Sequence, residues 1–434
     1  MNAAPETDQP PLAGPLHSRN FRLLLTGSTV NALGSSITPV ALAFAVLDLG
    51  GSAAQLGLVV AAFALAEVLT TLFGGVLGDR LPRAVMMQGS CAASAITQAV
   101  VAASLIGHWS SITLLGTIGL LNGVVSALNG PSSRAITQLT VPPANLVAAI
   151  SLRRLGMNAA SIAGFGVAGL LVASFGSGWA IAVDAATYVA AGLCFALLRV
   201  AALPPAKHRS LFGDLGAGAR EVFRHAWLWA LIGQALIYHL FFGGAQGVLG
   251  PIVVGSSYGR AAWGWALSAL MAGFVIGGVV TLRWRPRRAL RAGTACLVLT
   301  AAFPVAMAIG GHLELLLLGA FLHGFGLEIF SVWWDYSIQQ NVPPDKLARV
   351  FSFDIVGSFV ARPVGLALTG PVAQAVGFER WLLVVAAVMA GTTVLALLLP
   401  GVRRLERRET AQTTQTSEAE VQAERAVEVG DQLG

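Results

Sequence analysis

Apolar stretches of about twenty residues or more recur twelve times along this 434-residue chain. A helix needs about 20 apolar residues to cross a hydrocarbon core of about 30 Å. Because unpaired backbone groups are costly in lipid, stretches of this kind cross a membrane as helices. The sequence therefore predicts an all-α membrane protein. The spans are predicted over 21–47, 53–77, 84–106, 111–138, 148–175, 178–199, 226–254, 261–282, 289–311, 313–338, 350–375 and 378–400.

The composition and the absence of catalytic motifs argue against an enzyme. Only 11% of the residues are charged and 55% are hydrophobic, whereas soluble proteins carry about a quarter charged residues. This excludes most soluble enzymes and nucleic-acid-binding modules. The sequence contains no HExxH motif, no phosphate-binding glycine loop and no Cys/His cluster with metal spacing. We therefore expect no enzymatic activity, no cofactor and no metal site.

The basic residues predict how the chain is oriented in the membrane. Basic residues concentrate in cytoplasmic segments. With both termini in the cytoplasm, 24 of the 27 Lys and Arg residues fall inside, Arg260 and Arg380 fall outside, and Arg362 lies within a span. With eleven spans, the segments rich in basic residues would no longer all fall on the cytoplasmic side. The predominance of Arg over Lys is typical of a GC-rich bacterial genome, so we expect a multi-pass protein of the bacterial inner membrane.

An internal repeat relates the two sets of six spans. Val141-Pro142-Pro143 reappears as Val342-Pro343-Pro344, and Gly74-Gly75-Val76 reappears as Gly277-Gly278-Val279. Repeats of this kind indicate two similar structural units. We expect two pseudosymmetric six-helix bundles at 19–200 and 226–400. A cytoplasmic N-terminal segment at 1–18, a cytoplasmic linker at 201–225 and a disordered cytoplasmic tail at 401–434 would complete the chain.

The repeat and one loop motif carry a family resemblance. The motif follows the second span and reads Gly75-x-x-x-Asp79-Arg80-x-x-Arg83. With twelve spans in a parallel repeat, it resembles the major facilitator superfamily. Three further segments are similar to its drug-exporting branch, which includes macrolide and enterobactin exporters: Asn20-Phe21-Arg22-Leu23, Leu47-Asp48-Leu49-Gly50-Gly51-Ser52 and Arg362-Pro363-Val364-Gly365.

This resemblance implies secondary active efflux of a small lipophilic or amphiphilic drug or natural product by alternating access, coupled to protons. It also implies a monomer whose partners are the cargo, the proton and the lipid bilayer. The chain departs from the family pattern at three places. Pro82 stands where the loop usually has Gly, Leu282 replaces the acid in the second copy, and Phe165 stands where drug–proton antiporters often carry Pro.

Several polar side chains are predicted near the middle of the membrane, where transporters of this architecture bind cargo. Ionisable groups are expensive there and are functional candidates by default. Glu67 lies about 18 Å along its helix from Asp79, close to the midplane. It is a candidate for proton coupling, and a structural hydrogen bond to a neighbouring helix is the alternative. Candidates for lining a substrate cavity are Asn31, Asn122, Gln234, Tyr238, His239 and His323.

Glu328 and Arg362 form the second set of proton-coupling candidates. Counted from Asp335 and Asp354, they lie about 11–12 Å from the cytoplasmic ends of two consecutive helices. Equal depth permits an ion pair, and a charge buried alone would be costly. We therefore predict that Arg362 neutralises Glu328, with different surroundings for the two side chains as the alternative.

The repeat also predicts a cytoplasmic gate. A shift of 201 residues relates Arg134 to Asp335 and Arg153 to Asp354, so the first half presents arginines where the second half presents aspartates. These opposite charges would meet when the two halves close on that side. The alternative is that the two arginines simply follow the general preference for basic residues on the cytoplasmic side of the membrane. That preference does not explain the two aspartates. Asp79, Arg80 and Arg83 of the loop motif are expected to join this gate.

Two other functions fit the same spans. A solute importer or uniporter would share the fold, and a transporter-like receptor would not need the gate charges. The aromatic side chains near the predicted cavity, such as Phe241, Phe325 and Phe330, favour a lipophilic cargo over an acid or a sugar.

Overall fold

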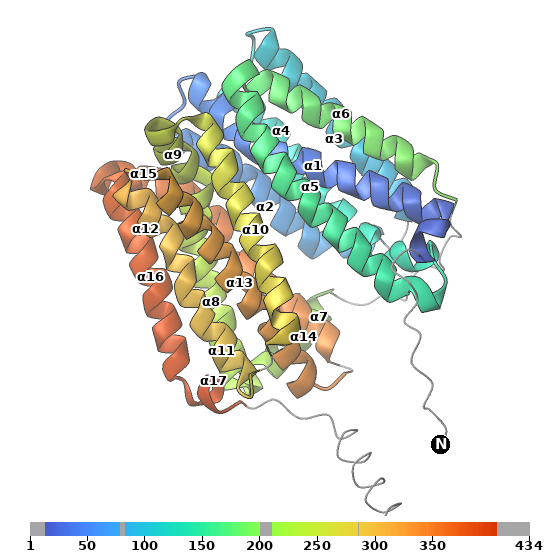
Figure 1. Ribbon diagram of the computed structural model, residues 1–434, viewed down its shortest axis with the longest axis vertical. Coiled ribbons are helices and arrows are strands. Elements are labelled where there is room, and N and C mark those ends of the chain that lie inside the picture. The colour runs from blue at the N-terminus through green and yellow to red at the C-terminus, as the bar shows by residue number, and fades with distance from the viewer. Residues whose placement is uncertain (1–13, 79–82, 200–210, 285, 345, 406–434) are drawn as a thin grey trace, which may run out of the picture.

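The structure is a computed structural model that describes residues 14–78, 83–199, 211–284, 286–344 and 346–405, and the regular elements in those ranges are all helical (Figure 1). In the first half, short 3₁₀ turns at Gly14–His17, Thr137–Leu139 and Pro143–Asn145 accompany the long helices. The long helices are α1 (Arg19–Asp48), α2 (Ala53–Gly78), α3 (Arg83–Ile106), α4 (Ile112–Ala135), α5 (Leu146–Phe175) and α6 (Ser177–Ala196).

The second half contains three interrupted spans. The helix α8 (Ala226–Gly244) continues through a π-helical turn, η4 (Ala245–Leu249), into α9 (Gly250–Tyr258). In the same way α11 (Ala289–Cys296) continues through the 3₁₀ turn η5 (Leu297–Ala301) into α12 (Ala302–Ile309). The other helices are α10 (Arg260–Arg283), α13 (Leu313–Asn341), α14 (Leu347–Phe359), α15 (Arg362–Val376), α16 (Phe378–Leu398) and α17 (Pro400–Arg404).

The twelve predicted spans each correspond to one helix or to one continuous run of helices. Eleven such segments of the described chain are long and apolar enough to cross a membrane. The twelfth is α4, whose fully described part, Ile112–Ala127, is shorter. Helices of the first half pack on one another, as do those of the second half. The predicted all-α fold, with two bundles of six spans, is therefore confirmed.

The internal repeat is visible in the helix boundaries. The helices α4 and α13 begin at Ile112 and Leu313, and α6 and α16 begin at Ser177 and Phe378, a separation of 201 residues in each case. Gly176 and Gly377 precede the second pair, with φ of 85° and 98°. Only glycine adopts such angles readily, so both halves use the same tight turn between their last two spans.

A break inside the eleventh span separates α14 from α15. Val360 and Ala361 form a turn, and Pro363 stands in the first turn of α15. Proline has no backbone N–H, so it cannot continue the hydrogen bonding of a helix that precedes it. The break leaves Arg362 at the first position of α15, well inside the span.

The linker contains a helix that the sequence did not predict. This helix, α7 (Leu211–Arg224), packs against α14, and Val222 is buried in a cluster with side chains of α8, α13 and α14. The predicted disordered tail, 401–434, begins instead with the helix α17, whose Val402 is buried against the second half. Its residues from 406 onward lie outside the described part, as do residues 1–13 and 200–210.

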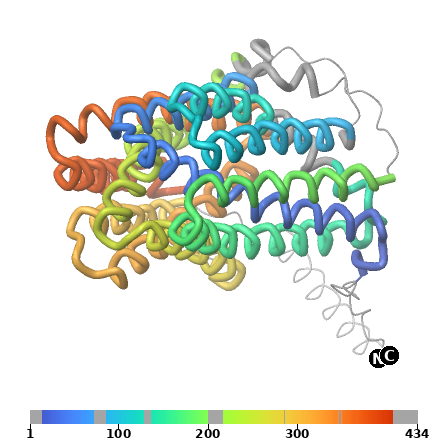
Figure 2. Tube along the Cα trace, turned by 90° about the horizontal axis from the view of Figure 1, so that it is seen from above, coloured from blue at the N-terminus to red at the C-terminus, as the bar shows by residue number. Residues whose placement is uncertain are grey.

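The two halves touch near one end of the molecule, which we call the Asp48 end. There α5 packs on α10 and α2 packs on α15. Gly169 lies against Ala261 and Gly264, and Gly57 lies against Leu366. Toward the opposite end, which holds α7 and which we call the linker end, the halves diverge (Figure 1). Figure 2 shows the same division from above, with the blue-to-green helices largely on one side and the yellow-to-red helices on the other.

Candidate functional site

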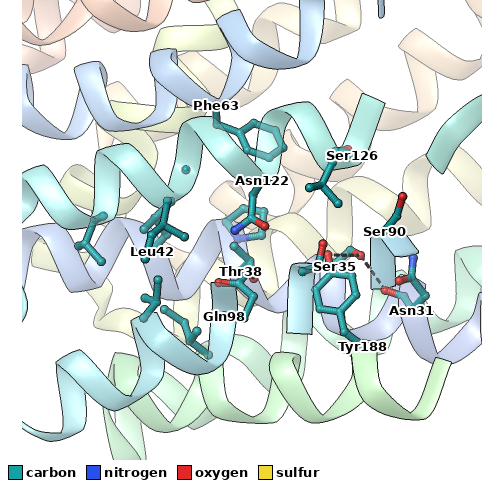
Figure 3. A pocket seen from close by; sticks show the side chains of 18 residues that line it. Asn31, Ser35, Thr38, Leu42, Phe63, Ser90, Gln98, Asn122, Ser126 and Tyr188 are labelled. Atoms are coloured by element: carbon teal, nitrogen blue, oxygen red, sulfur yellow. Dashed lines mark hydrogen bonds between the residues drawn. The ribbon is translucent and has the colours of Figure 1, made fainter. Parts of the chain in front are cut away.

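A polar cavity of about 290 Å³ lies inside the first half (Figure 3). On α1, Asn31, Ser35 and Thr38 follow a helical spacing of four and three residues, which places them on one face. The neighbouring helices α3, α4 and α6 supply the rest of the polar lining: Ser90, Ser94, Gln98, Asn122, Ser126 and Tyr188.

Most polar groups around this cavity already have partners. The Asn122 side-chain oxygen accepts a hydrogen bond of 2.8 Å from the Thr97 hydroxyl. The Ser35 hydroxyl donates to the Asn31 backbone carbonyl at 2.7 Å (Figure 3). The Asn31 side-chain Oδ1 is buried and has no partner in the described part of the chain. Of the two cavity candidates on α1 and α4, Asn31 is therefore the one with a buried side-chain acceptor left unpaired among the described residues.

A second cavity of about 310 Å³ lies inside the second half and is lined mainly by aromatic and aliphatic side chains. It contains three of the predicted cavity residues, Gln234, Tyr238 and His239, all on α8. The other large side chains that line it come from α10, α13, α14 and α16: Phe274, Leu327, Phe330, Trp334, Phe359 and Met389.

His323, the remaining cavity candidate, is buried behind the wall of this cavity. Its side chain is 1% exposed, and it is not among the described residues that line the cavity. Its Nδ1 lies 2.7 Å from the Thr300 carbonyl oxygen, and its Nε2 lies 2.6 Å from the Tyr238 hydroxyl. A carbonyl only accepts, so Nδ1 carries the proton and Nε2 accepts from Tyr238. Both ring nitrogens are satisfied, and His323 ties α13 to η5 and α8.

Glu67 and Arg362 line a third cavity, of about 360 Å³, between α2 and the α14–α15 break. The Glu67 carboxylate accepts a hydrogen bond of 3.2 Å from the Ser126 hydroxyl on α4, the type of bond foreseen as its structural alternative. Arg362 forms no ion pair with any described residue. The cavity thus brings an acid of the first half and a base of the second half to a shared space.

Glu328 pairs with Arg154 and not with Arg362, contrary to the prediction. The Arg154 guanidinium lies 3.2 Å from the Glu328 carboxylate and joins α5 to α13 across the two halves. The prediction assumed that consecutive spans are neighbours. Instead α13 packs mainly on α10, α11 and α12, whereas α15 packs on α8 and α2. Equal depth therefore does not bring Glu328 and Arg362 together.

Of the predicted gate pairs, only Arg153 and Asp354 both have described side chains, and the described contacts of each are with other groups. Arg153 is buried in the first half, where it donates to the Ser28 hydroxyl at 3.1 Å and to the Thr137 hydroxyl at 2.9 Å. Asp354 accepts from Trp334 Nε1 at 3.0 Å and from the Ser358 hydroxyl at 3.1 Å. Asp335 is close enough to Arg154 for the two opposite charges to attract each other.

The other gate residues cannot be placed. Asp79 and Arg80 lie outside the described residues, and so do the side chains of Arg83 and Arg134. The gate therefore stays a prediction about a different arrangement of the halves.

Sequence reasoning missed an ion pair at the Asp48 end. The Arg260 guanidinium donates to both carboxylate oxygens of Asp48, at 2.5 and 2.9 Å, and covers the Phe44 ring at 5.4 Å. This pair links the two halves. Arg260 is one of the two basic residues predicted on the outside. This exception to the distribution of basic residues could have indicated that Arg260 has an acidic partner there.

Comparisons with known proteins agree with the fold. The sequence profile of the Major Facilitator Superfamily matches residues 24–302. The chain is 27% identical over 399 residues to "Multidrug efflux pump Tap" of Mycolicibacterium fortuitum, with 88% of this chain and 96% of that protein covered. It is 22% identical over 406 residues to "Macrolide efflux protein A" of Streptococcus pyogenes, with 89% and 97% covered.

Among solved structures, the nucleoside transporter NupG superimposes with a TM-score of 0.70 at 13% identity, covering 89% of this chain and 100% of that one. At this identity the likeness concerns the fold alone. The profile covers more than half of the chain, and the helical architecture agrees with it. This chain is therefore a multi-pass membrane transporter, not an enzyme, and it belongs to the Major Facilitator Superfamily.

Proposed function

We propose that this protein exports small lipophilic or amphiphilic molecules, drugs or natural products, across the bacterial inner membrane. The observation that carries the proposal is the similarity along 88% of the chain to a relative named as a multidrug efflux pump. The cavity chemistry supports it, because an aromatic cavity with few polar groups suits a lipophilic cargo.

Alternating access is the proposed mechanism. The halves touch at the Asp48 end, and the distribution of basic residues supports an orientation with that end outside and both termini in the cytoplasm. The arrangement is then one that opens toward the cytoplasm. Rocking the halves about the cavities would open the Asp48 end and bring Arg134 and Arg153 toward Asp335 and Asp354. The loop residues Asp79, Arg80 and Arg83 would join this closed gate.

Proton coupling is proposed at the acids that face the space between the halves. Glu67 shares a cavity with Arg362, and Glu328 is held by Arg154. A carboxylate that loses its basic partner when the halves move binds a proton more readily, because an unpaired charge in a buried site is costly. Arg362 and Arg154 would supply that change of partner.

Flux measurements in liposomes containing the purified protein test this function. A panel of lipophilic antibiotics and dyes would be offered, and internal pH followed by a trapped indicator. We expect cargo export to be accompanied by proton movement, and the proton signal to fall at least tenfold in Glu67→Gln.

The outcomes separate the candidate functions. Cargo movement without proton flux would establish a uniporter and assign Glu67 a structural role. Uptake driven toward the cytoplasmic face would establish an importer. Absence of flux for every cargo, with Arg154→Met indistinguishable from wild type in all measurements, would favour a receptor that does not transport.

A further inference from the structure

The aromatic cavity of the second half contains a carboxylate with no positive partner. Asp354 is the only carboxylate among the described side chains that line this cavity, and no described Lys or Arg lines it. Its carboxylate is held by the Trp334 indole N–H and the Ser358 hydroxyl, both of which are neutral. A nearby acid, Asp335, acts on it as a like charge. The cavity thus presents a carboxyl group for which no described lining residue supplies a positive partner.

A buried acceptor with no donor lies in the same cavity. The Thr393 hydroxyl donates to the Met389 carbonyl at 2.8 Å, so its oxygen is left to accept. The Gln234 amide N–H therefore faces Thr393, at 3.0 Å, and the orientation of the amide is determined. Gln234 is 8% exposed, and its Oε1 has no partner in the described part of the chain. Buried acceptors are nearly always paired, so we expect this oxygen to accept a hydrogen bond from a ligand or a water molecule.

Aromatic rings form the walls around these two groups. Phe330 and Trp334 stack with ring centroids 5.9 Å apart, and His239 lies on Phe359 at 4.0 Å. The His239 Nδ1 lies 2.8 Å from the Ala235 carbonyl, so Nδ1 holds a proton, and the ring also interacts with the Ser358 backbone. Ring faces attract cations.

Arg362 lines the third cavity and is a positive charge near Tyr238 and His239. It does not line the aromatic cavity.

From these observations we infer that the second-half cavity binds flat lipophilic cations bearing an N–H donor, with Asp354 as the counter-charge and Gln234 Oε1 as the hydrogen-bond acceptor. The inference rests on the proposed function in so far as this cavity receives the cargo. It narrows the cargo from lipophilic molecules in general to protonated or permanently charged aromatic amines.

Equilibrium binding to the purified full-length protein in detergent tests the inference without requiring transport. Ethidium is a suitable probe because it is a planar cation with aromatic amino groups, and tetraphenylphosphonium is a lipophilic cation without an N–H. Asp354→Asn should weaken binding of both probes at least tenfold. Gln234→Met should weaken ethidium binding at least threefold and leave tetraphenylphosphonium binding within twofold of wild type.

Two further variants complete the test. Glu314→Gln removes an exposed acid from the far end of α13 and should leave both affinities within twofold. In Ser331→Cys, a thiol is placed in the cavity wall, and bound ethidium should slow its alkylation at least fivefold. This readout serves also if Asp354→Asn does not fold.

The inference is overturned if folded Asp354→Asn binds ethidium within twofold of wild type, or if ethidium does not protect the new thiol. Either result would leave the export proposal standing, because that proposal is tested by flux. Failure of flux with intact, Asp354-dependent binding would overturn export and leave the cation site in place.

Discussion

Two consecutive arginines of α5 lie in different surroundings. Successive helical residues are about 100° apart around the axis. Arg153 consequently points into its own half, toward Ser28 and Thr137, whereas Arg154 points across to Glu328. The Arg154 side chain is 70% exposed and the Glu328 side chain 13%. An ion pair this exposed on one side contributes little to stability, about 1 kcal/mol or less. The pair therefore adds little to folding, and we propose that it acts in the movement of the halves.

The first prediction concerns this pair. Arg154→Met should leave the melting temperature in detergent within about 2 °C of wild type, because an exposed pair is worth about 1 kcal/mol or less. It should slow cargo flux at least fivefold, and Glu328→Gln should have the same effect. The double variant should be no slower than either single variant, since both remove one interaction. Additive losses would show that the two residues act separately.

The second prediction concerns Asp184, which is fully buried between α6, α1 and α3. Its carboxylate accepts hydrogen bonds from the Thr38 hydroxyl and from the Gln98 amide. Asp184→Ala removes the acceptor of the Thr38 hydroxyl and of one of the two Gln98 N–H groups, which costs about 1–3 kcal/mol. We expect a lower melting temperature in detergent, with Glu314→Ala as an exposed control that stays near wild type. A melting temperature for Asp184→Ala equal to that of the control would contradict this role.

At the scale of elements, the carboxylate of Glu221 links the linker helix α7 to the second half. Glu221 is 7% exposed and accepts from Lys346 Nζ at 3.0 Å and from Arg224 at 3.3 Å. Gly218 lies against the Arg349 backbone, so the helix approaches α14 closely. The hydrogen bond from Lys346 and the neighbouring positive charges hold the pKa of Glu221 below its ordinary value.

The third prediction follows from that lowered pKa. A carboxyl with a depressed folded-state pKa contributes stability that is fully present above its ordinary pKa and lost as the pH falls through the lowered value. Glu221→Gln should therefore lower the free energy of unfolding by about 1 kcal/mol near neutral pH. Trypsin should cleave faster after Arg220 and Arg224 in the variant.

Melting curves over a pH series provide the check. The difference between wild type and Glu221→Gln should shrink as the pH falls below the ordinary pKa of glutamate and vanish in strong acid. A difference that stays constant with pH would mean that the side chain acts through packing and not through its charge.

At the scale of the whole molecule, glycines let the two halves meet. A Cβ added at Gly264 would collide with the Phe165 carbonyl and the Gly169 backbone. Small residues at such contacts allow membrane helices to approach closely. In lipid the hydrophobic effect does not bring helices together, so van der Waals packing at these close contacts stabilises their association. The Asp48–Arg260 pair reinforces the same contact.

The fourth prediction uses this contact. Gly264→Val should push α10 away from α5 and destabilise the arrangement closed at the Asp48 end, with an overpacking cost of about 1–3 kcal/mol. Cargo flux should fall at least tenfold. Gly391→Val is the matched control, because a Cβ at that position of α16 meets nothing within 4 Å. Equal flux in the two variants would mean that the closed contact is not needed for transport.

The number, order and limits of the spans were readable from the amino-acid sequence. The spans predicted at 148–175 and 313–338 differ from α5 and α13 by at most three residues at each end. This is possible because lipid cannot hydrogen-bond the backbone, so an apolar stretch of sufficient length has one solution, the helix. The repeat was readable for the same reason, since both halves repeat the same pattern of apolar stretches and turns.

The partners of the charged and polar side chains were decided by the tertiary structure. The depth of a residue in the membrane follows from counting residues along its helix. Its partner depends also on which helix packs against the face from which its side chain projects, and the sequence does not give that helix. Because α13 packs on α10 and faces α5, Glu328 meets Arg154; because α15 packs on α8 and α2, Arg362 shares a cavity with Glu67. Hydrophobicity dictates that a helix crosses the membrane, whereas the close packing of small residues between helices selects which helices touch.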